Sequence, residues 1–513
     1  MKKIPLLERR RCGILMPIFS LPSPYGIGSL GKAAYDFVDF LEAAGQSYWQ
    51  ILPLGPTGFG DSPYQSYSTY AGNPYFVDLE TLCRDGYLMR EECDAVDFGN
   101  DPDSVDYVKL HKGRFPLFRL AYARFAKNIP EDFEIFCKKQ AYWLNDYALF
   151  MALKDENDGI SFDLWADDIK LRKRNALKAA QIRLQEDTQY WKMIQYFFYR
   201  QWAALKEYAN SKGISIIGDV PIYVSPDSAD VWSSPDQFLL DTERRPIKVA
   251  GCPPDAFTAD GQLWGNPLYR WDKMREDGYA WWCKRLKAAA SLYDVIRFDH
   301  FRGFEAYYTI PAGRKNAKRG TWEKGPGQEF FSTIHRKLGD LDIIAEDLGF
   351  LTKGVYDLLK ATGYPGMKVV QFGFGDPPSD SEYMPHNFPK NCVAYTGTHD
   401  NETILGWLGE ATKGTVRAVT SYFRLTEKEG KNWGVMRGVL ASPANTVILQ
   451  MQDFLGLDNR ARINEPSTLG DNWLWRIRPE CLNPWLSNLI LIDATTYFRT
   501  PPTAKKPKYE DKA

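Results

Sequence analysis

The sequence predicts an α/β fold built on a parallel (β/α)₈ TIM barrel, with large and mostly helical insertions between strands. The chain has 513 residues, which is long for one compact domain unless that domain is a barrel with insertions. Short apolar runs that end in Gly, Pro or polar residues alternate with segments of helical periodicity, which is typical of a parallel sheet. Eight such runs occur, and eight is the number of strands that closes a TIM barrel.

The apolar runs are the candidate barrel strands, and several are near-continuously apolar, as expected for parallel strands buried on both faces. They lie at 13–19, 47–54, 213–220, 294–299, 342–347, 367–375, 391–400 and 445–454. A helix is predicted before the third run, because apolar residues recur there at steps of three and four. These residues are Trp191, Ile194, Phe198, Trp202 and Leu205.

The uneven spacing of the runs predicts a single barrel over 1–500 with two insertions. A mostly helical insertion is expected at 65–190, after the second strand, where Phe136, Trp143, Tyr147 and Met151 mark an amphipathic helix. The segment 226–293, after the third strand, is rich in Pro, Gly, Asp and Trp and is expected to be a loop or small subdomain. The Pro/Lys-rich end, 501–513, is expected to be a flexible tail.

Composition favours a neutral partner. The 64 Lys and Arg balance the 65 Asp and Glu, so the net charge favours neither nucleic acid nor an anionic membrane. The chain has 16 Trp, 29 Tyr and 29 Phe. Most of these rings are expected in the core, and the rest suit the flat faces of sugars.

The cysteine and histidine patterns predict a cytoplasmic protein without a metal or cofactor. The eight cysteines include no CxxC pair, so we expect reduced thiols. The first residues, MKKIPLLERRR, hold too short an apolar stretch for a signal peptide, and no run is long enough to span a bilayer. With five His and no HxxxH or Cys/His cluster, no metal site is implied.

Ionisable residues end four of the predicted strands, where a barrel enzyme has its active site. One acid at a strand end is often a loop cap or an ion-pair partner, but four ionisable clusters at one rim are hard to explain structurally. The candidates are Asp219 on the third strand, Arg297 and Asp299 on the fourth, Glu346 and Asp347 on the fifth, and His399 and Asp400 on the seventh.

The segment VIRFDHFRG (295–303) points to a nucleophile. Side chains alternate along a strand, so Arg297 and Asp299 share one face. A neighbouring guanidinium favours the ionised carboxylate that a nucleophile needs. A purely structural Arg–Asp pair remains the alternative at this point.

A second carboxyl is needed to protonate a leaving oxygen. Glu346 or Asp347, on the next strand, can supply it, and alternation says only that one of the two faces inward. Adjacent strands lie about 4.8 Å apart, so the two rims can approach the roughly 5–5.5 Å carboxyl spacing of retaining glycosidases. Asp400 would stabilise positive charge or hold sugar hydroxyls, and His399 could donate a hydrogen bond to a hydroxyl.

The motifs RFDHFRG, AEDLG and THDN, in this order, resemble the glucan-processing α-amylase clan. More narrowly, the chain resembles the 4-α-glucanotransferase (amylomaltase) family from about residue 12 to 476. The motifs that carry this narrower resemblance are SPYQSYSTYAGNP (62–74), GDVPIYV (218–224), PPDAFTADGQLWGNP (253–267) and INEPSTLGDNWLWR (463–476).

The resemblance implies roles for the matched positions. It implies that Asp299 is the nucleophile, Glu346 the acid/base and Asp400 the transition-state stabiliser. Tyr64, Asp219, Arg297 and His399 match residues around the attacked sugar, Gln262 and Trp264 lie in a loop (251–267) that folds over the glucan, and Asn472 is expected to bind substrate. Near 467–472 the family usually has Gly-Thr and Gly-Asn-Trp, whereas this chain has Ser467-Thr468 and Gly470-Asp471-Asn472-Trp473.

The resemblance also implies the absence of the C-terminal β-sandwich of the α-amylases, and too few residues follow the eighth strand to build one. The implied reaction moves a segment of α-1,4-glucan from a donor malto-oligosaccharide to the 4-hydroxyl of an acceptor glucan or glucose, through a β-glucosyl-Asp intermediate. Phe257 and Trp264 could cover the cleft and exclude water, which favours transfer.

Three alternatives remain at this point. A hydrolase of α-1,4-glucans would use the same site. A phosphate-binding metabolic barrel would want a Gly-rich loop after the last two strands, but GTHDN (397–401) carries an acid there. A non-catalytic glucan-binding protein would not need three acids at strand ends.

Overall fold

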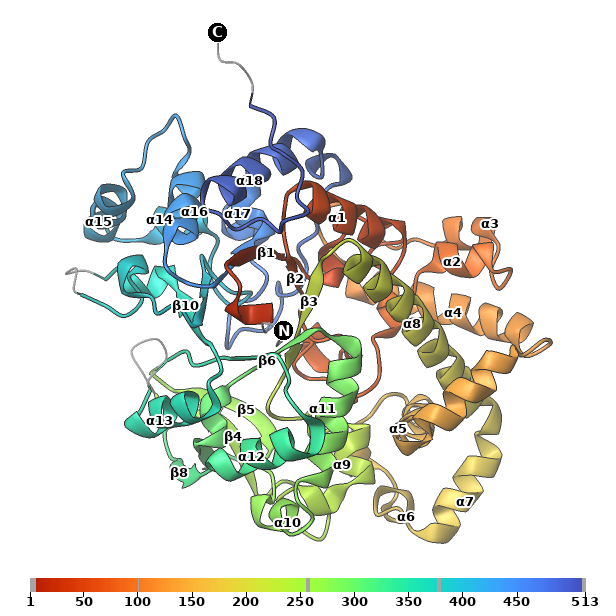
Figure 1. Cartoon of the computed structure of the whole chain (residues 1–513). Coiled ribbons are helices and arrows are strands. Elements are labelled where there is room, and N and C mark those ends of the chain that lie inside the picture. The colour runs from red at the N-terminus through yellow and green to blue at the C-terminus, as the bar shows by residue number, and fades with distance from the viewer. Residues whose placement is uncertain (1–5, 100, 255–258, 350, 376–379, 510–513) are drawn as a thin grey trace.

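The computed structural model describes residues 6–99, 101–254, 259–349, 351–375 and 380–509. Its centre is a closed barrel of parallel strands in the order β1-β12-β11-β10-β9-β6-β3-β2 (Figure 1). The strands are β1 (Arg11–Leu15), β2 (Tyr48–Gln50), β3 (Ser215–Val220), β6 (Val295–Phe298), β9 (Ile343–Ala345), β10 (Gly366–Val369), β11 (Cys392–Tyr395) and β12 (Thr446–Gln450). Each overlaps one of the eight predicted runs, so the predicted barrel is confirmed. Several runs overshoot their strands because the apolar stretch continues into the loop that follows.

Alternate residues of the strands fill the barrel interior as one buried cluster. Its members are Leu15, Tyr48, Ile217, Val295, Ile344, Met367, Val369, Val393, Tyr395 and Ile448, with Leu7 from the 3-10 turn η1 (Leu6–Glu8). Side chains two residues apart on a strand share a face. Asp219, Arg297 and Glu346 each follow an interior residue by two positions, so the barrel interior becomes polar at the carboxyl ends of the strands.

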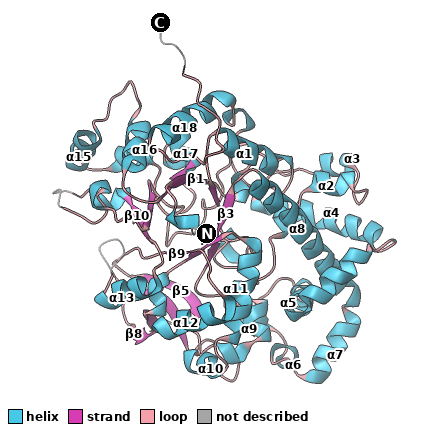
Figure 2. Cartoon of the chain, viewed as in Figure 1, coloured by secondary structure: helices cyan, strands magenta, loops and turns pink. Residues whose placement is uncertain are grey.

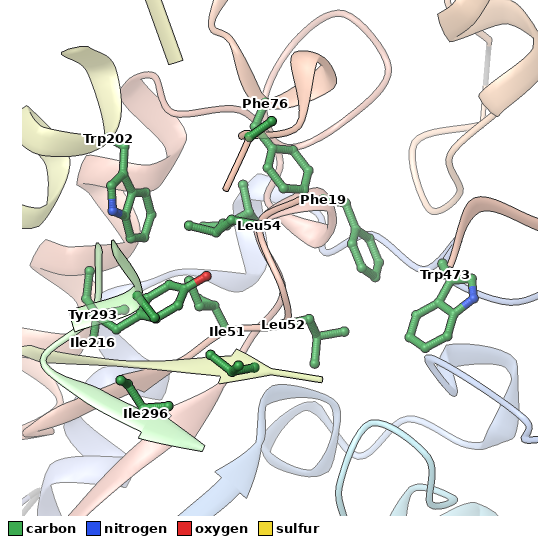
Figure 3. Packing of buried hydrophobic residues seen from close by; sticks show 14 of the residues in the cluster. Phe19, Ile51, Leu52, Leu54, Phe76, Trp202, Ile216, Tyr293, Ile296 and Trp473 are labelled. Carbon is green, nitrogen blue, oxygen red and sulfur yellow. The ribbon is translucent and has the colours of Figure 1, made fainter. Parts of the chain in front are cut away.

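Helices surround the barrel (Figures 1 and 2). They include α1 (Lys32–Ala43), α8 (Gln185–Ser211), α11 (Ala280–Leu292), α12 (Gly327–Leu338), α13 (Lys353–Thr362), α15 (Lys413–Phe423), α16 (Lys431–Ala441) and α18 (Pro484–Thr496). The predicted apolar stripe of α8 is buried along its whole length. Trp202 of this helix lies beside Tyr293 and Ile216 in the layer between helix and barrel (Figure 3).

The segment predicted as a helical insertion holds α2 (Leu79–Arg84), α3 (Arg90–Asp94), α4 (Tyr107–Phe125), α5 (Glu131–Glu156), α6 (Asp167–Lys170) and α7 (Arg174–Arg183). Helix α5 packs along α8, with Trp143 against Tyr199 and Tyr147 against Trp191. The insertion is thereby anchored on a helix that also covers the barrel.

A second, antiparallel sheet has the order β5-β4-β7-β8. Its strands are β4 (Lys248–Cys252), β5 (Gln262–Pro267), β7 (Ala306–Pro311) and β8 (Thr321–Lys324). The sequence predicts a loop or small subdomain over 226–293, whereas the structure has two strands of this sheet there and two more beyond residue 293. The strands are short, and the pairing of β4 with β5 shifts register between Val249 and Gly251. Apolar and polar residues therefore do not alternate regularly along these strands, and the sequence carries no clear strand signal.

Beyond β12 the described residues form α17 (Met451–Leu455), short 3-10 turns and α18, and they include no further strand. This agrees with the expectation that no β-sandwich follows the barrel. In the described part of the predicted tail, Lys508 exchanges two backbone hydrogen bonds with the Asn488 side chain, of 2.8 and 2.9 Å. No helix within the described ranges has the length and apolar character needed to cross a membrane.

Candidate active site

The paired registers of three neighbouring strands bring the predicted residues together. Asp219 of β3 is in register with Arg297 of β6, and Phe298 of β6 is in register with Ala345 of β9. Asp299 and Glu346 therefore follow equivalent positions on adjacent strands. The Glu346 N–H donates to the carbonyl of Phe298 (2.9 Å), which extends the strand pairing up to the two acids.

Arg297 joins two carboxylates on the barrel rim. Its Nη1 donates to Asp219 Oδ2 at 2.6 Å and to Asp299 Oδ1 at 3.1 Å. The side chains of Arg297 and Asp219 are 4 % and 1 % exposed, whereas that of Asp299 is 28 % exposed. The buried pair of Arg297 and Asp219 thus orients Asp299, the more exposed of the two carboxylates that Arg297 contacts. The hydroxyl of Tyr64 donates to the same Asp219 oxygen at 2.8 Å.

Glu346 continues the inward face of its strand, as Asp299 does on the neighbouring strand, and Asp347 takes the other face. The Glu346 carboxylate accepts hydrogen bonds from the N–H groups of His300 (2.7 Å) and Leu348 (2.8 Å). Asp347 instead accepts from the Met367 N–H at 2.6 Å, on the neighbouring strand β10. A Cβ added to Gly366 would lie 2.4 Å from Asp347 Oδ2, so a glycine there leaves room for this outward carboxylate.

Burial raises the pKa of both acids, by different amounts. The pKa of Asp299 rises to about 6, and the Arg297 charge opposes that rise. The pKa of Glu346 rises to about 7, because Asp299 adds to the effect of burial while Arg297 opposes it. The contact with Arg297 favours the ionised form of Asp299, whereas burial and the neighbouring Asp299 charge favour the protonated form of Glu346. Two neighbouring carboxyls, one of them paired with a cation, suit a nucleophile and a general acid.

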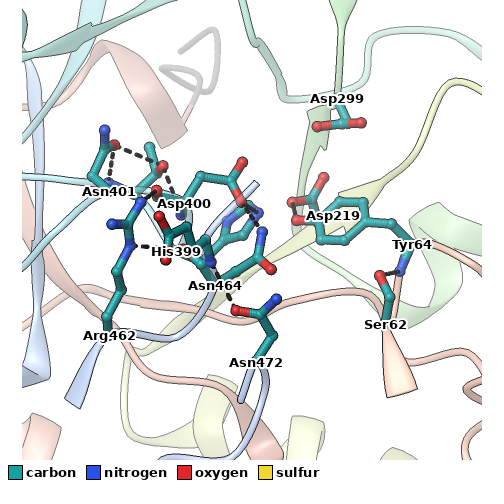
Figure 4. A network of polar contacts seen from close by, with 12 residues as sticks. Ser62, Tyr64, Asp219, Asp299, His399, Asp400, Asn401, Arg462, Asn464 and Asn472 are labelled. Atoms are coloured by element: carbon teal, nitrogen blue, oxygen red, sulfur yellow. Dashed lines mark hydrogen bonds and ion pairs between the residues drawn. The ribbon is translucent and has the colours of Figure 1, made fainter. Parts of the chain in front are cut away.

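His399 and Asp400 lie on the loop after β11, across the rim from Asp299 (Figure 4). The His399 ring stacks on Tyr64 with centroids 5.1 Å apart, and its Nε2 lies 3.3 Å from Asp400 Oδ1. Burial lowers the pKa of His399, although Asp400 opposes this shift. The lowered pKa favours a neutral His399 ring. This ring lies beside the Asp400 side chain, which is 43 % exposed.

Two residues that contact Asp400 or His399 were not singled out from the sequence, namely Asn464 and Trp473. Asn464 Nδ2 donates to Asp400 Oδ1 at 2.6 Å, which fixes the orientation of that carboxylate. The Trp473 ring lies 5.9 Å from Tyr64 and 6.0 Å from His399, centroid to centroid. Both residues belong to the motif at 463–476. That motif could have indicated that the segment belongs to the site, but nothing in it showed which of its residues lie beside Asp400 and His399.

Two further predicted residues, Gln262 and Trp264, lie on strand β5 and not on the loop expected for them. Trp264 packs edge-on against His300 (4.8 Å between centroids) and donates from Nε1 to Gln262 Oε1 (3.0 Å). This places β5 beside the residue that follows Asp299. Phe257, which was expected to help cover the cleft, lies outside the described residues.

The hydrogen bonds of the Asn472 side chain stay within its own loop. Its side chain accepts from the Glu465 N–H (2.9 Å) and donates to the Thr468 hydroxyl (3.0 Å), so its amide closes its own loop. The positive φ of Ser467 (68°) and Asp471 (54°) gives this loop its tight turns. The departure from the usual family pattern falls at these turns.

The fold and the site define a barrel enzyme with paired carboxyls of the kind that acts at the anomeric centre of a sugar. The sequence pattern of the family described as 4-alpha-glucanotransferase matches residues 16–482. This match covers most of the chain, and the chain therefore belongs to the 4-α-glucanotransferase family.

Individual relatives agree with this assignment. A 4-alpha-glucanotransferase from Clostridium butyricum is 51 % identical over 477 residues, which cover 93 % of this chain and 98 % of the relative. One from Streptococcus pneumoniae is 47 % identical over 496 residues, covering 96 % and 98 % of the two chains. A solved amylomaltase from Streptococcus agalactiae, in complex with acarbose, superposes with a TM-score of 0.94 at 42 % identity, covering 96 % of this chain and 100 % of that one.

Proposed function

We propose that the enzyme moves α-1,4-glucan segments from a donor malto-oligosaccharide to the 4-hydroxyl of an acceptor glucan or glucose, with retention of configuration. The observation that carries the proposal is the pair of Asp299 and Glu346 at equivalent ends of adjacent strands. Arg297 orients the first acid, and two backbone N–H groups hold the second. The relatives' shared name, 4-alpha-glucanotransferase, supports transfer rather than hydrolysis.

In the first step, the ionised Asp299 attacks the anomeric carbon of the donor. The bond to the leaving glucan oxygen breaks, and Glu346 gives its proton to that oxygen. The contact of Arg297 with Asp299 supports this division of roles, because the guanidinium favours the ionised form of Asp299, whereas burial and the Asp299 charge raise the pKa of Glu346 and favour its protonated form. The step leaves a β-glucosyl ester on Asp299 and an ionised Glu346.

In the second step, the ionised Glu346 takes the proton from the 4-hydroxyl of an acceptor, and the acceptor oxygen attacks the anomeric carbon from the other side. The ester bond breaks and releases Asp299 as a carboxylate. Two displacements restore the original α configuration, and both acids return to their starting protonation states.

Asp400 stabilises the positive charge that develops on the sugar ring in both transition states. Asn464 holds one of its oxygens, and the other remains available to sugar hydroxyls. His399, Tyr64, Asp219 and Arg297 bind the sugar that is attacked. Gln262 and Trp264 contact the glucan chain from β5, and Asn472 shapes the loop that carries Asn464.

A test with maltotriose separates the candidate functions. A glucanotransferase produces free glucose together with maltodextrins longer than maltotriose. A hydrolase produces only shorter sugars, and a glucan-binding protein leaves maltotriose unchanged. The Asp299→Asn variant should keep its fold and lose turnover by several orders of magnitude. Near-normal disproportionation by that variant would remove Asp299 as the nucleophile.

Trapping the intermediate tests the roles of both acids. In Glu346→Gln, a substrate that needs no acid, such as α-maltosyl fluoride, should still form the ester, but the ester should break down slowly because the base is missing. Mass spectrometry of the digested protein should then find the sugar on the peptide that contains Asp299. A sugar on the peptide with Asp400 would reverse the assignment.

We also propose that the enzyme works in the cytoplasm. The eight cysteines all lie in the described residues and form no disulfide there, which suits a reducing compartment. Subcellular fractionation of the source cells tests this, and recovery of the activity outside the cytoplasmic fraction would contradict it.

A further inference from the structure

The buried carboxylate of Asp453 takes no part in the mechanism described above. Asp453 lies in α17, which begins immediately after β12, and it is 1 % exposed. A carboxylate so deeply buried is expensive to keep unless donors satisfy it. Its donors therefore indicate what it does.

Both donors lie on the loop that carries His399 and Asp400. Asp453 Oδ2 accepts from the Thr396 hydroxyl at 2.6 Å, and Oδ1 accepts from the Ile404 N–H at 2.8 Å. Thr396 is the first residue after β11, and Ile404 is the first residue of α14 (Ile404–Glu410). One side chain thus holds both ends of the segment 396–404.

The two contacts favour the carboxylate form of Asp453 against the effect of burial. Burial raises the pKa of Asp453 to about 7, and the hydrogen bonds from Ile404 and Thr396 oppose that rise by stabilising the ionised form. Hydrogen bonds to a carboxylate in a low-dielectric interior are shorter and stronger than bonds between neutral groups.

Two further side chains hold the same segment from the strands that flank β11. Gln371, which follows β10, and Gln450, at the end of β12, both donate to the carbonyl of Glu402, at 2.9 and 3.3 Å. Asp453 itself is anchored, because Asn432 of α16 donates to its carbonyl at 2.7 Å. The segment is therefore fixed to the barrel wall, and not only to its own strand.

We propose that Asp453 is a positioning residue for Asp400: by holding Thr396 and Ile404 it sets where the Asp400 carboxylate lies at the barrel mouth. The inference rests on the proposed function, in which Asp400 stabilises the transition state. Asp400 contributes most at the transition state, so a shift of its carboxylate lowers kcat more than it raises KM.

The test variant is Asp453→Asn. The amide oxygen can still accept from the Ile404 N–H, but the NH₂ group is a donor, so the Thr396 hydroxyl must turn to accept from it and both contacts lose the carboxylate charge. A displacement of about 1 Å in a catalytic group lowers the rate by about 100-fold. We therefore expect kcat for maltotriose disproportionation to fall by about 100-fold, with KM changing by less than about twofold.

Asp78→Asn is the matched control. Asp78 is also buried, and it too accepts one N–H, from Thr81 (2.7 Å), and one hydroxyl, from Ser29 (2.8 Å). It caps α2 in the helical insertion. The control should lower thermal stability as Asp453→Asn does, and should leave kcat within about twofold of the wild type. Equal kcat losses in the two variants would mean that Asp453 acts only through stability and would overturn the proposal.

The Asp400→Asn background separates this inference from the proposed function. With α-maltosyl fluoride as donor, adding Asp453→Asn to Asp400→Asn should cause less than about a twofold further loss, because the group that Asp453 positions is already gone. A full further loss would overturn the proposal. If Asp400→Asn alone keeps normal activity, the proposed role of Asp400 fails instead. Should Asp453→Asn not fold, Thr396→Val removes one of the two contacts, and an unchanged kcat would refute the inference.

Discussion

Replacing Arg297 by methionine tests whether one buried charge sets the ionisation of the proposed nucleophile. Methionine fills a similar length of the buried space without a charge. The change removes both contacts of Nη1, the one to Asp219 at 2.6 Å and the one to Asp299 at 3.1 Å. Two carboxylates then face each other with no cation between them, so the pKa of Asp299 must rise.

The size of the effect follows from the distance. Two unit charges about 4 Å apart at an effective dielectric constant of about 20 interact by about 4 kcal/mol, which corresponds to about 3 pKa units. The loss of this interaction would move the pKa of Asp299, about 6 in the wild type, toward about 9 in the variant. The ionised fraction of Asp299 would fall about 500-fold at pH 6 and only about 10-fold at pH 8.

The assay is the pH profile of kcat/KM for maltotriose disproportionation. The ratio of wild-type to variant activity should be largest at low pH and should shrink by more than about tenfold between pH 6 and pH 8, because alkaline pH restores the carboxylate. Removing one partner of a buried pair also destabilises the fold by about 3–5 kcal/mol, so both proteins are assayed below the unfolding transition of the variant.

Arg285→Met is the matched control. Arg285 is as deeply buried as Arg297 (4 % against 3 % exposed), but it donates to the backbone carbonyls of Pro221 and Ile222. Its loss should lower stability without moving the acid limb of the profile. A folded Arg297→Met whose activity ratio stays constant from pH 6 to pH 8 would refute the reasoning.

Three further predictions concern the other parts of the site. Glu346→Gln should lower disproportionation far more than Asp347→Asn, because only Glu346 lies on the inward face with Asp299. The kcat values of both variants check this, and the opposite ranking would exchange the two roles. Asn464→Ala should lower kcat by about 10- to 100-fold, since a hydrogen bond to a charged group contributes about 1.5–3 kcal/mol; an unchanged kcat would mean that Asp400 needs no such partner. Trp264→Ala should raise the share of glucose formed by hydrolysis, because the ring shields the residue next to Asp299 from water; an unchanged product ratio would show that other groups exclude water.

The barrel could be predicted because its signal is local. Each strand is a short apolar run, since its residues are buried on both faces, and helix α8 has an apolar stripe that can be read from residue spacing alone. The end of each run also marks the rim, so Asp219, Asp299, Glu346 and Asp400 could be named as one group. The resemblance to known motifs then implied a role for each of them.

The second sheet, and the contact of Asn464 with Asp400 in the site, could not be predicted in the same way. Strand β4 pairs with β5 on one side and with β7, more than 50 residues along the chain, on the other. Asn464 reaches Asp400 across 64 residues of sequence. Such contacts depend on where whole segments pack, and no local pattern records them.

Glu346 and Asp347 show what the sequence determines about the site and what the tertiary structure adds. The sequence by itself determined that a parallel barrel forms, that acids end its strands, and that one of these two neighbours faces inward, because alternation along a strand is a property of the backbone. The resemblance to known motifs assigned the role to Glu346, and the tertiary structure supplies the physical reason, because the packing of Ile344 inside the closed barrel sets the parity of the whole strand. Closure of the barrel likewise decided that Arg297, Asp299 and Glu346 share one mouth, since side chains from separate strands meet only when every strand has its neighbours.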